Sequence, residues 1–211
     1  VDRYDPAEIR SLYRDYRGDD YRRQRCRHEF WYTRASNDAM GGPAEIARRN
    51  LRLSAFLRDS GVLPGARSAL DWGGDRGQFI PASFTERFVY DVSGVQPFPG
   101  VTSLSLEEAR RRAFDLIILA HVLEHASDPV GFLQDVTSIV SSHLYVEVPC
   151  EPFAVPRFQY SSSIYLQWVR ASARIRWYPL LAFLSTAARV KARRLLPFGV
   201  LQQHEHLNYF E

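Results

Sequence analysis

The chain has 211 residues, of which 45% are hydrophobic and 24% are charged, and its formal net charge is +3. This length allows one sizeable core, and the composition is that of a globular protein rather than of a disordered or fibrous chain. The two cysteines, Cys26 and Cys150, form no metal or disulfide pattern, and no apolar run reaches the roughly 18 residues that a membrane span needs. Since the chain also starts with charged residues, we expect a cytoplasmic protein.

Residues 1–43 are predicted to form a helical lid. Asp5 and Pro6 mark a helix start, and apolar side chains follow at helical spacing. That predicted face consists of Ile9, Leu12, Tyr13 and Tyr16. A second helix is predicted for about residues 44–60, because its apolar side chains share one face and Gly61 can end it.

Residues 44–150 are predicted to form a Rossmann-like α/β core with a doubly wound, mostly parallel sheet, because strand and helix patterns alternate there. The expected strands are residues 68–72, 87–91, 101–104, 114–120 and 143–148. A helix is expected after the first strand, and another from Asp128-Pro129. The buried stripe predicted for that later helix is Phe132, Leu133, Val136, Ile139 and Val140.

After the fifth strand the alternation ends, and residues 151–203 are predicted to be a helical, arginine-rich cap or insertion. No acid occurs between Pro152 and His204. The basic residues of this stretch are Arg157, Arg170, Arg174, Arg176, Arg189, Lys191, Arg193 and Arg194. Such a block suggests a surface for phosphates, nucleic acid or acidic lipid. Residues 204–211 are expected to begin the C-terminal part of the core, whose last strands we expect to lie beyond this chain.

The most informative motif is a glycine turn between the first two predicted strands. It reads Asp71-Trp-Gly73-Gly-Asp-Arg-Gly77, and Asp91 ends the next strand. Glycines let a ligand approach the backbone, and an acid after the second strand can accept hydrogen bonds from a ribose diol. The carboxylates of Asp71 and Asp75 would repel a pyrophosphate, so they favour a ligand with positive charge near the turn.

The same turn resembles motif I of class I S-adenosylmethionine-dependent methyltransferases, with Asp75 replacing the usual middle glycine. Three further segments carry the resemblance. Residues 114–129 (Phe-Asp-Leu-Ile-Ile-Leu-Ala-His-Val-Leu-Glu-His-Ala-Ser-Asp-Pro) resemble the segment after motif I, and residues 144–149 its fifth strand. Residues 204–210 (His-Glu-His-Leu-Asn-Tyr-Phe) are similar to a segment of members that methylate sugars and other small metabolites. The tyrosine-rich N-terminal helix looks like the lid of such enzymes.

The resemblance implies S-adenosylmethionine as the cofactor and assigns residues to its parts. Asp91 would bind the ribose, Val92 would line the adenine side, and His121 would face the sulfonium. The full set of expected cofactor-binding residues is Asp71, Gly73, Gly74, Asp75, Gly77, Asp91, Val92, Ser105, Leu106 and His121. An acceptor that must lose a proton needs a base, and His125 and His206 are the first candidates, followed by His204, Glu147 and Glu151.

The implied acceptor is a small molecule, a sugar or a nucleotide- or lipid-linked saccharide. Two alternatives stay open. An RNA methyltransferase would explain arginines interleaved with Trp168, Trp177 and Tyr178. A non-catalytic, cofactor-binding assembly protein on an anionic membrane would explain the apolar and basic stretch 180–196. Oligomeric state is left open.

One motif has a competing interpretation. His121-Val-Leu-Glu-His125 matches H-x-x-E-H, a zinc-protease signature that needs both histidines on one helical face. A buried strand ends directly before it and a new helix starts at Asp128, so too little helix remains. We therefore expect no metal site.

Overall fold

The computed structural model describes residues 6–149, except 14–15, 17, 29–32 and 40, together with residues 180, 183–184, 187–188 and 191. Several expectations fall outside this part of the chain. They concern the bases Glu151, His204 and His206, the start of a C-terminal core segment at 204–211, and most of the arginine-rich stretch 151–203. The RNA and membrane alternatives depend on that stretch, so they stay predictions.

The core is a sheet of five parallel strands in the order β3-β2-β1-β4-β5. The strands are β1 (Ser68–Trp72), β2 (Glu86–Tyr90), β3 (Thr102–Ser103), β4 (Phe114–Ala120) and β5 (Val140–Glu147). The strand order reverses at β1, which pairs with both β2 and β4. Ligands of open α/β sheets bind at the carboxyl ends of strands beside such a reversal. The sheet confirms the predicted Rossmann-like fold.

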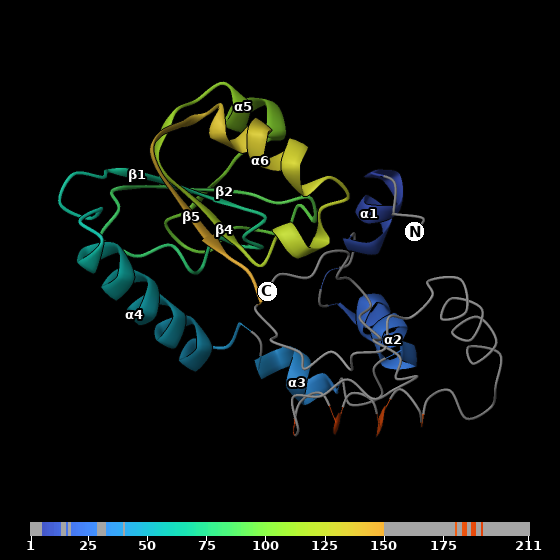
Figure 1. Ribbon diagram of the computed structural model, residues 1–211. Coiled ribbons are helices and arrows are strands. Elements are labelled where there is room, and N and C mark those ends of the chain that lie inside the picture. Colours follow the sequence, from blue (N-terminus) through green and yellow to red (C-terminus); the bar gives the residue numbers. More distant parts are fainter. Residues whose placement is uncertain are drawn as a thin grey trace, which may run out of the picture.

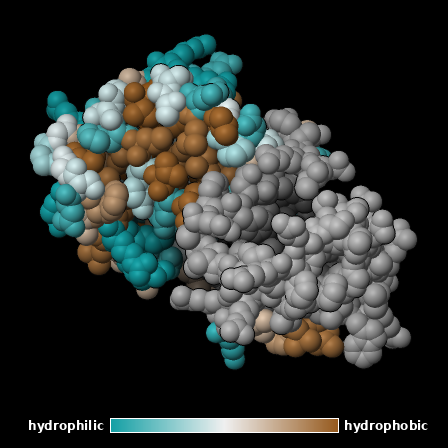
Figure 2. Space-filling model, viewed as in Figure 1, coloured by the Kyte–Doolittle hydropathy of each residue, from teal (hydrophilic) through white to brown (hydrophobic). Residues whose placement is uncertain are grey.

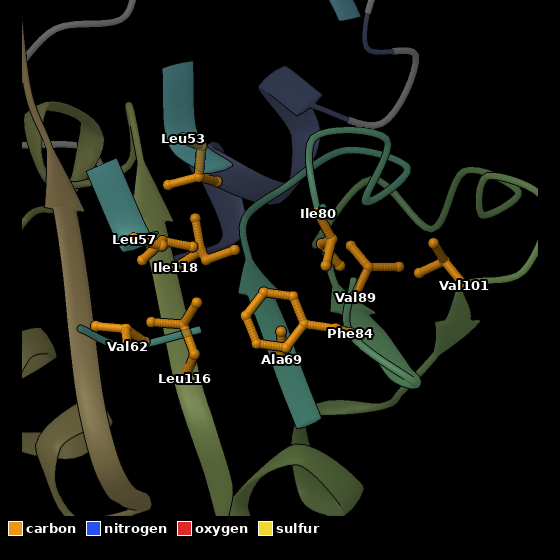
Figure 3. Close-up of a cluster of buried hydrophobic side chains, with 10 residues drawn as sticks. All are labelled: Leu53, Leu57, Val62, Ala69, Ile80, Phe84, Val89, Val101, Leu116 and Ile118. Atoms are coloured by element: carbon orange, nitrogen blue, oxygen red, sulfur yellow. The ribbon is translucent and has the colours of Figure 1, made fainter. Parts of the chain in front are cut away.

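Helices cover both faces of this sheet (Figure 1). Helix α4 (Pro43–Asp59) lies on one face, and α5 (Leu106–Arg110) and α6 (Pro129–Thr137) lie on the other. Leu53 and Leu57 of α4 pack with side chains of β1, β2 and β4 in one buried cluster (Figure 3). Val136 of α6 packs in a second cluster on the opposite face. The doubly wound arrangement therefore has two apolar layers.

Strand β4 shows why an uninterrupted apolar run can form a central strand. Leu116 and Ile118 belong to the cluster beneath α4, whereas Ile117 and Leu119 belong to the cluster beneath α6. Successive side chains of a strand point to opposite faces, so a strand covered on both sides needs apolar residues at every position. All four side chains are fully buried.

The N-terminal part contains helices α1 (Pro6–Tyr13), α2 (Asp19–His28) and α3 (Arg34–Ala39). The prediction included α1 and α4 but neither α2 nor α3. Helix α2 is polar on almost every side, so it has no apolar period to detect, yet Tyr21 is only 3% exposed and anchors it. Asp19 and Asp20 in its first turn pair with Arg22 and Arg23, which stabilises the helix locally.

The expectation of a helix directly after the glycine turn is wrong. Residues 75–79 form successive turns, with the Gly77 amide donating to the Gly74 carbonyl at 2.8 Å. Ile80 and Phe84 from this connection are each 2% exposed and fill the space over the sheet that a crossover helix would cover. Pro81 also disfavours helical backbone in the residue before it.

The predicted stripe of α6 was too long at its C-terminal end. The helix ends at Thr137, and Val140 is the first residue of β5, paired with Phe114 of β4. Strand β5 therefore begins three residues earlier than expected. Val140 packs in the same apolar cluster as Phe132, Leu133 and Val136. An apolar residue at position 140 therefore fits both the predicted helix stripe and the observed strand.

Strand β5 forms an edge of the sheet in the described part of the chain, where its only strand partner is β4. Hydrophobic side chains gather in the middle of the α/β face shown in Figure 2. The exposed apolar side chains of the molecule include Phe56 at 55%, Val130 at 65% and Val146 at 42%. No helix in the described segments has the length and apolar character to cross a membrane.

Candidate active site

The glycine turn after β1 is built so tightly that side chains are excluded at three positions. A Cβ on Gly73 would lie 2.8 Å from Cγ2 of Val122, and Gly73 has φ of 77°. A Cβ on Gly74 would lie 2.0 Å from Cγ of Asp71. A Cβ on Gly77, which has φ of 70°, would lie 2.8 Å from Cγ1 of Val101. The turn thus needs glycine for both conformation and space.

Asp71 lies beneath this turn and is 1% exposed. Its Oδ1 atom is buried and accepts no hydrogen bond from any described residue. Burial raises the pKa of Asp71 to about 7, against the opposing charge of Arg49, and the nearby charges of Asp91 and Asp75 raise it further. A buried carboxyl oxygen without a partner is costly in a folded protein and calls for a donor from a ligand.

Asp91, directly after β2, holds the glycine turn against that strand. Its Oδ2 accepts the Asp75 amide at 2.8 Å, and its Oδ1 accepts the Ser93 amide at 2.8 Å and the Ser93 hydroxyl at 2.5 Å. Asp75 adopts a left-handed φ of 57°, which is uncommon for a residue other than glycine and is typical of functional turns. Oδ1 of Asp91 thus uses both of its lone pairs, whereas Oδ2 keeps one lone pair that can accept from a ligand.

His121, after β4, is fixed between two carboxylates, and we call His121, Glu124 and Glu147 the histidine clamp. Nδ1 of His121 lies 3.2 Å from Oε1 of Glu124, and Nε2 lies 3.3 Å from Oε1 of Glu147. Two carboxylate acceptors require both ring nitrogens to carry protons. The hydrogen bonds to Glu124 and Glu147 accordingly raise the pKa of His121 to about 9. His121 is therefore an imidazolium at neutral pH.

The two carboxylates of the clamp differ in burial. Glu124 is fully buried, and no described residue hydrogen bonds to its Oε2. Burial acts to raise the pKa of Glu124, but the hydrogen bond to His121 and the nearby positive charge outweigh it and lower the pKa. Glu147 also accepts the Tyr145 hydroxyl at 3.0 Å. The His121 bond holds the pKa of Glu147 at about 2, so Glu147 is a weak base.

His125 ends a short 3₁₀ turn, η1 (Leu123–His125), beside the clamp. Its Nε2 lies 4.0 Å from Oε1 of Glu124, and its ring packs edge-on against Tyr13 of α1 at 6.0 Å. His121 precedes this turn with a left-handed φ of 58°. The two histidines therefore do not share an α-helical face, which the zinc-protease interpretation requires.

A cavity of about 580 Å³ joins these groups. Of the residues expected to bind the cofactor, the lining includes Asp71, Gly73, Gly74, Asp75, Asp91, Val92 and His121. His125 also lines it, whereas Glu147 contacts it through His121. The structure thus collects the acids and the first histidines of the prediction at one place.

Three expected cofactor residues do not line this cavity. Gly77 faces the core against Val101. Ser105 caps α5, where its hydroxyl accepts the Glu108 amide at 3.2 Å and the Glu108 carboxylate accepts the Ser105 amide at 2.8 Å. Leu106 packs against the apolar cluster on the α6 face.

Sequence reasoning missed several residues of the cavity wall. They are Tyr13, Tyr16, Arg25, Glu45, Arg49, Phe79, Tyr90, Glu124 and Phe132. Glu124 could have been found, because it lies inside the histidine motif. Arg49 carried no such signal, since its neighbour Arg48 on the same helix has the same side chain but pairs with Glu45 in solvent. Only the packing of α4 decides that Arg49 lines the cavity and Arg48 does not.

The parallel sheet, the reversal at β1 and the acid-flanked glycine turn are features typical of nucleoside-binding α/β proteins, and the cavity beside them has the size of a small-ligand site. A family model described as a methyltransferase domain matches residues 41–211, and the chain belongs to this family. The match confirms the resemblance to class I S-adenosylmethionine-dependent methyltransferases, whose members generally use that cofactor. No curated protein matched the chain.

Proposed function

We propose that this methyltransferase uses S-adenosylmethionine and acts on a small-molecule acceptor, a sugar or a phosphate-linked saccharide. One observation carries the proposal. The acids of the glycine turn and the histidines after β4 face one cavity, although 50 residues of sequence separate Asp71 from His121. A donor site and a proton-handling site thus share one space.

The residues present fit this cofactor. Asp71 offers a buried oxygen that no described side chain or amide satisfies, and the turn above it has no side chains in the way of a ligand. Asp75 and Asp91 add further negative charge. A cation therefore fits here better than a pyrophosphate. When bound, S-adenosylmethionine supplies an activated methyl group for in-line displacement.

Methyl transfer depends on orientation, and an acceptor hydroxyl must also lose a proton. His121 already carries a proton on each ring nitrogen, so it can orient groups but cannot accept a proton in this state. Glu147 is too weakly basic, with a pKa of about 2. His125 is half-buried, lines the cavity and lies beside the Glu124 carboxylate. We assign His125 as the base and the histidine clamp as its support.

The walls of the cavity support a small acceptor. Its volume falls in the range of small-ligand sites, which are lined mostly by aromatic and apolar side chains with few polar groups. Tyr13, the last residue of α1, and Tyr16, in the turn between α1 and α2, provide such walls at the side near His125. Arg25 adds a guanidinium suited to a phosphate on the acceptor.

The cofactor assignment is tested by calorimetric titration of S-adenosylmethionine into wild type and Asp91→Ala. Loss of the carboxylate should weaken binding by roughly tenfold or more, because a charged hydrogen-bond acceptor is removed and the turn loses its anchor. Asp135→Ala is the matched control, since Asp135 is exposed on α6 and, among the residues that the structure describes, its carboxylate pairs with Arg110 alone. Equal affinity of wild type and Asp91→Ala would refute the assignment.

The acceptor is tested by methyl transfer to a panel of sugar nucleotides and lipid-linked saccharides. We expect transfer to at least one of them, with loss on the order of 10² to 10⁴-fold in His125→Asn if His125 is the base. Cofactor affinity should be retained in that variant. A wild type that binds cofactor but methylates no member of the panel would contradict the saccharide proposal, and full activity in His125→Asn would contradict the base.

A further inference from the structure

A series of aromatic rings extends from His125 along one wall of the cavity. The His125 ring packs edge-on against Tyr13, with 6.0 Å between the ring centroids, and Tyr13 packs against Tyr16 at 5.4 Å. The Tyr16 ring in turn meets the Tyr21 ring edge-on at 5.1 Å. His125, Tyr13 and Tyr16 line the cavity, whereas Tyr21 is buried and does not. We call Tyr13, Tyr16 and Tyr21 the tyrosine row.

Arg25 lies at the end of the tyrosine row that is farther from His125. Its Nη1 donates to the Tyr21 hydroxyl at 2.9 Å, and its guanidinium carbon lies 5.9 Å from the centroid of the Tyr21 ring. The two residues are one turn apart on α2, so the helix itself brings them together. The phenol is neutral, so this hydrogen bond orients the guanidinium without cancelling its charge. Because Arg25 also lines the cavity, the wall ends in a positive charge.

The other cations of the cavity face carboxylates. Nη2 of Arg49 lies 3.6 Å from Oε2 of Glu147, and both ring nitrogens of His121 face the carboxylates of the histidine clamp. The acids of the glycine turn repel an anion. The end of the cavity near Arg25 is therefore the part that suits an anionic group of a ligand.

We propose that Arg25 binds a phosphate group of the acceptor, while the saccharide lies along Tyr13 and Tyr16 and the reacting hydroxyl faces His125. This inference rests on the proposed function and narrows it to acceptors that carry a phosphate or diphosphate. Guanidinium suits phosphate because its planar fork of N–H groups can pair with two oxygens at once. Two cavity-lining rings separate the base from the guanidinium, so the phosphate and the methylated hydroxyl lie at opposite ends of the acceptor.

The test is calorimetric titration of inorganic pyrophosphate into enzyme saturated with S-adenosylhomocysteine, which fills the cofactor site. Wild type should bind pyrophosphate, and Arg25→Gln should weaken this binding by roughly 10- to 100-fold, as expected for the loss of charged hydrogen bonds. Arg25→Lys keeps the charge without the planar fork, so its affinity should be intermediate. Arg23→Gln is the matched control and should bind like wild type, since Arg23 is exposed on the same helix and pairs with Asp20.

A second variant keeps the inference testable if Arg25→Gln does not fold. Tyr21→Phe keeps the buried ring that anchors α2 but removes the hydroxyl that orients the guanidinium, so it should weaken pyrophosphate binding several-fold. Wild-type affinity in both Arg25→Gln and Tyr21→Phe would overturn the inference. Loss of pyrophosphate binding in Arg49→Gln but not in Arg25→Gln would also overturn it, because the anion would then lie at Arg49.

Two further ligands separate the sources of the phosphate. Uridine diphosphate represents a nucleotide-linked saccharide, and geranyl diphosphate represents a lipid-linked one. The diphosphate that binds more tightly indicates the source, and its affinity should depend on Arg25 as that of pyrophosphate does. Binding of both diphosphates that is independent of Arg25 would refute the phosphate site.

The titration needs no methyl transfer, so its outcome is separate from that of the proposed function. A wild type that binds pyrophosphate through Arg25 but methylates no saccharide would keep the phosphate site and refute the saccharide. A wild type that methylates neutral sugars but does not bind pyrophosphate would overturn this inference and leave the proposed function. Failure to bind the cofactor in either form would remove both.

Discussion

Asp71 combines two properties that ordinarily exclude each other, full burial and a carboxyl oxygen to which no described residue donates a hydrogen bond. A buried carboxylate without a partner destabilises a fold, so the group stays protonated to a higher pH than usual. The glycine at position 74 makes the arrangement feasible, because any Cβ there would overlap the Asp71 carboxyl. Stability is given up locally at a point where a cationic ligand would restore it.

This burial predicts a pH-dependent stability. Between the ordinary pKa of 3.8 and the folded-state value of about 7, the folded chain holds a proton on Asp71 that the unfolded chain has lost. The free energy of unfolding should therefore fall with rising pH across this window, by roughly 1.4 kcal/mol per pH unit. In Asp71→Asn this slope should disappear, and the variant should be more stable than wild type above pH 7. Urea titrations at several pH values measure it.

His121 contributes a separate dependence with the same sign. Its pKa is raised from 6.5 to about 9, so its contribution is fully present below pH 6.5 and is lost as pH rises through 9. The two windows barely overlap, which lets Asp71→Asn isolate the lower one. A slope between pH 4 and 7 that is equal in wild type and Asp71→Asn would show that Asp71 is ionised in the folded state.

At the level of elements, the histidine clamp depends on two neighbouring strands ending together. The amide of His121 donates to the Glu147 carbonyl at 2.8 Å, which continues the β4–β5 ladder by one step before the chain turns. The left-handed backbone of His121 then directs the chain into η1, which brings the Glu124 carboxylate back to Nδ1 of the His121 ring. The sequence placed His121 at a strand end, but the pairing with Glu147 needed the register of β5.

Helix α5 gives a prediction that separates a cap from a binding residue. Ser105→Ala removes the hydroxyl of a reciprocal capping box, so it should cost about 1 kcal/mol of stability. Cofactor affinity should stay unchanged, because Ser105 does not line the cavity. Ser83→Ala, at an exposed position between β1 and β2, serves as the control in urea and calorimetric titrations. If Ser105→Ala weakened cofactor binding and Ser83→Ala did not, Ser105 would be a binding residue after all.

The connection from β1 to β2 shows a limit of pattern reading at this scale. Alternation of strands and helices predicted a helix after the glycine turn, whereas the chain forms turns that insert Ile80 and Phe84 into the core. Both solutions cover the same face of the sheet with apolar side chains. Local sequence does not say which of them leaves less space unfilled.

Across the whole molecule, α4 both covers the sheet and carries Arg49 to the cavity. Leu57→Ala should cost about 2 to 5 kcal/mol, because Leu57 is 1% exposed in the cluster with Ala69 and Leu116. Leu51→Ala, the same change at a position 73% exposed, should be close to neutral. Urea denaturation measures both. Similar losses in the two variants would mean that α4 does not dock through this face.

The sequence by itself determined the strands, the parallel sheet and the glycine turn with its acids. These depend on local spacing, on strand periodicity and on the rule that parallel strands end at one edge. The methyltransferase class came from the resemblance of its motifs to a known family. The tertiary structure decided which side chains meet at that edge. The position of the His121 ring between Glu124 and Glu147 follows from the register of β4 and β5. The docking of α4 decides that Arg49 rather than Arg48 lines the cavity. Those contacts join residues far apart in the chain, so no local pattern encodes them.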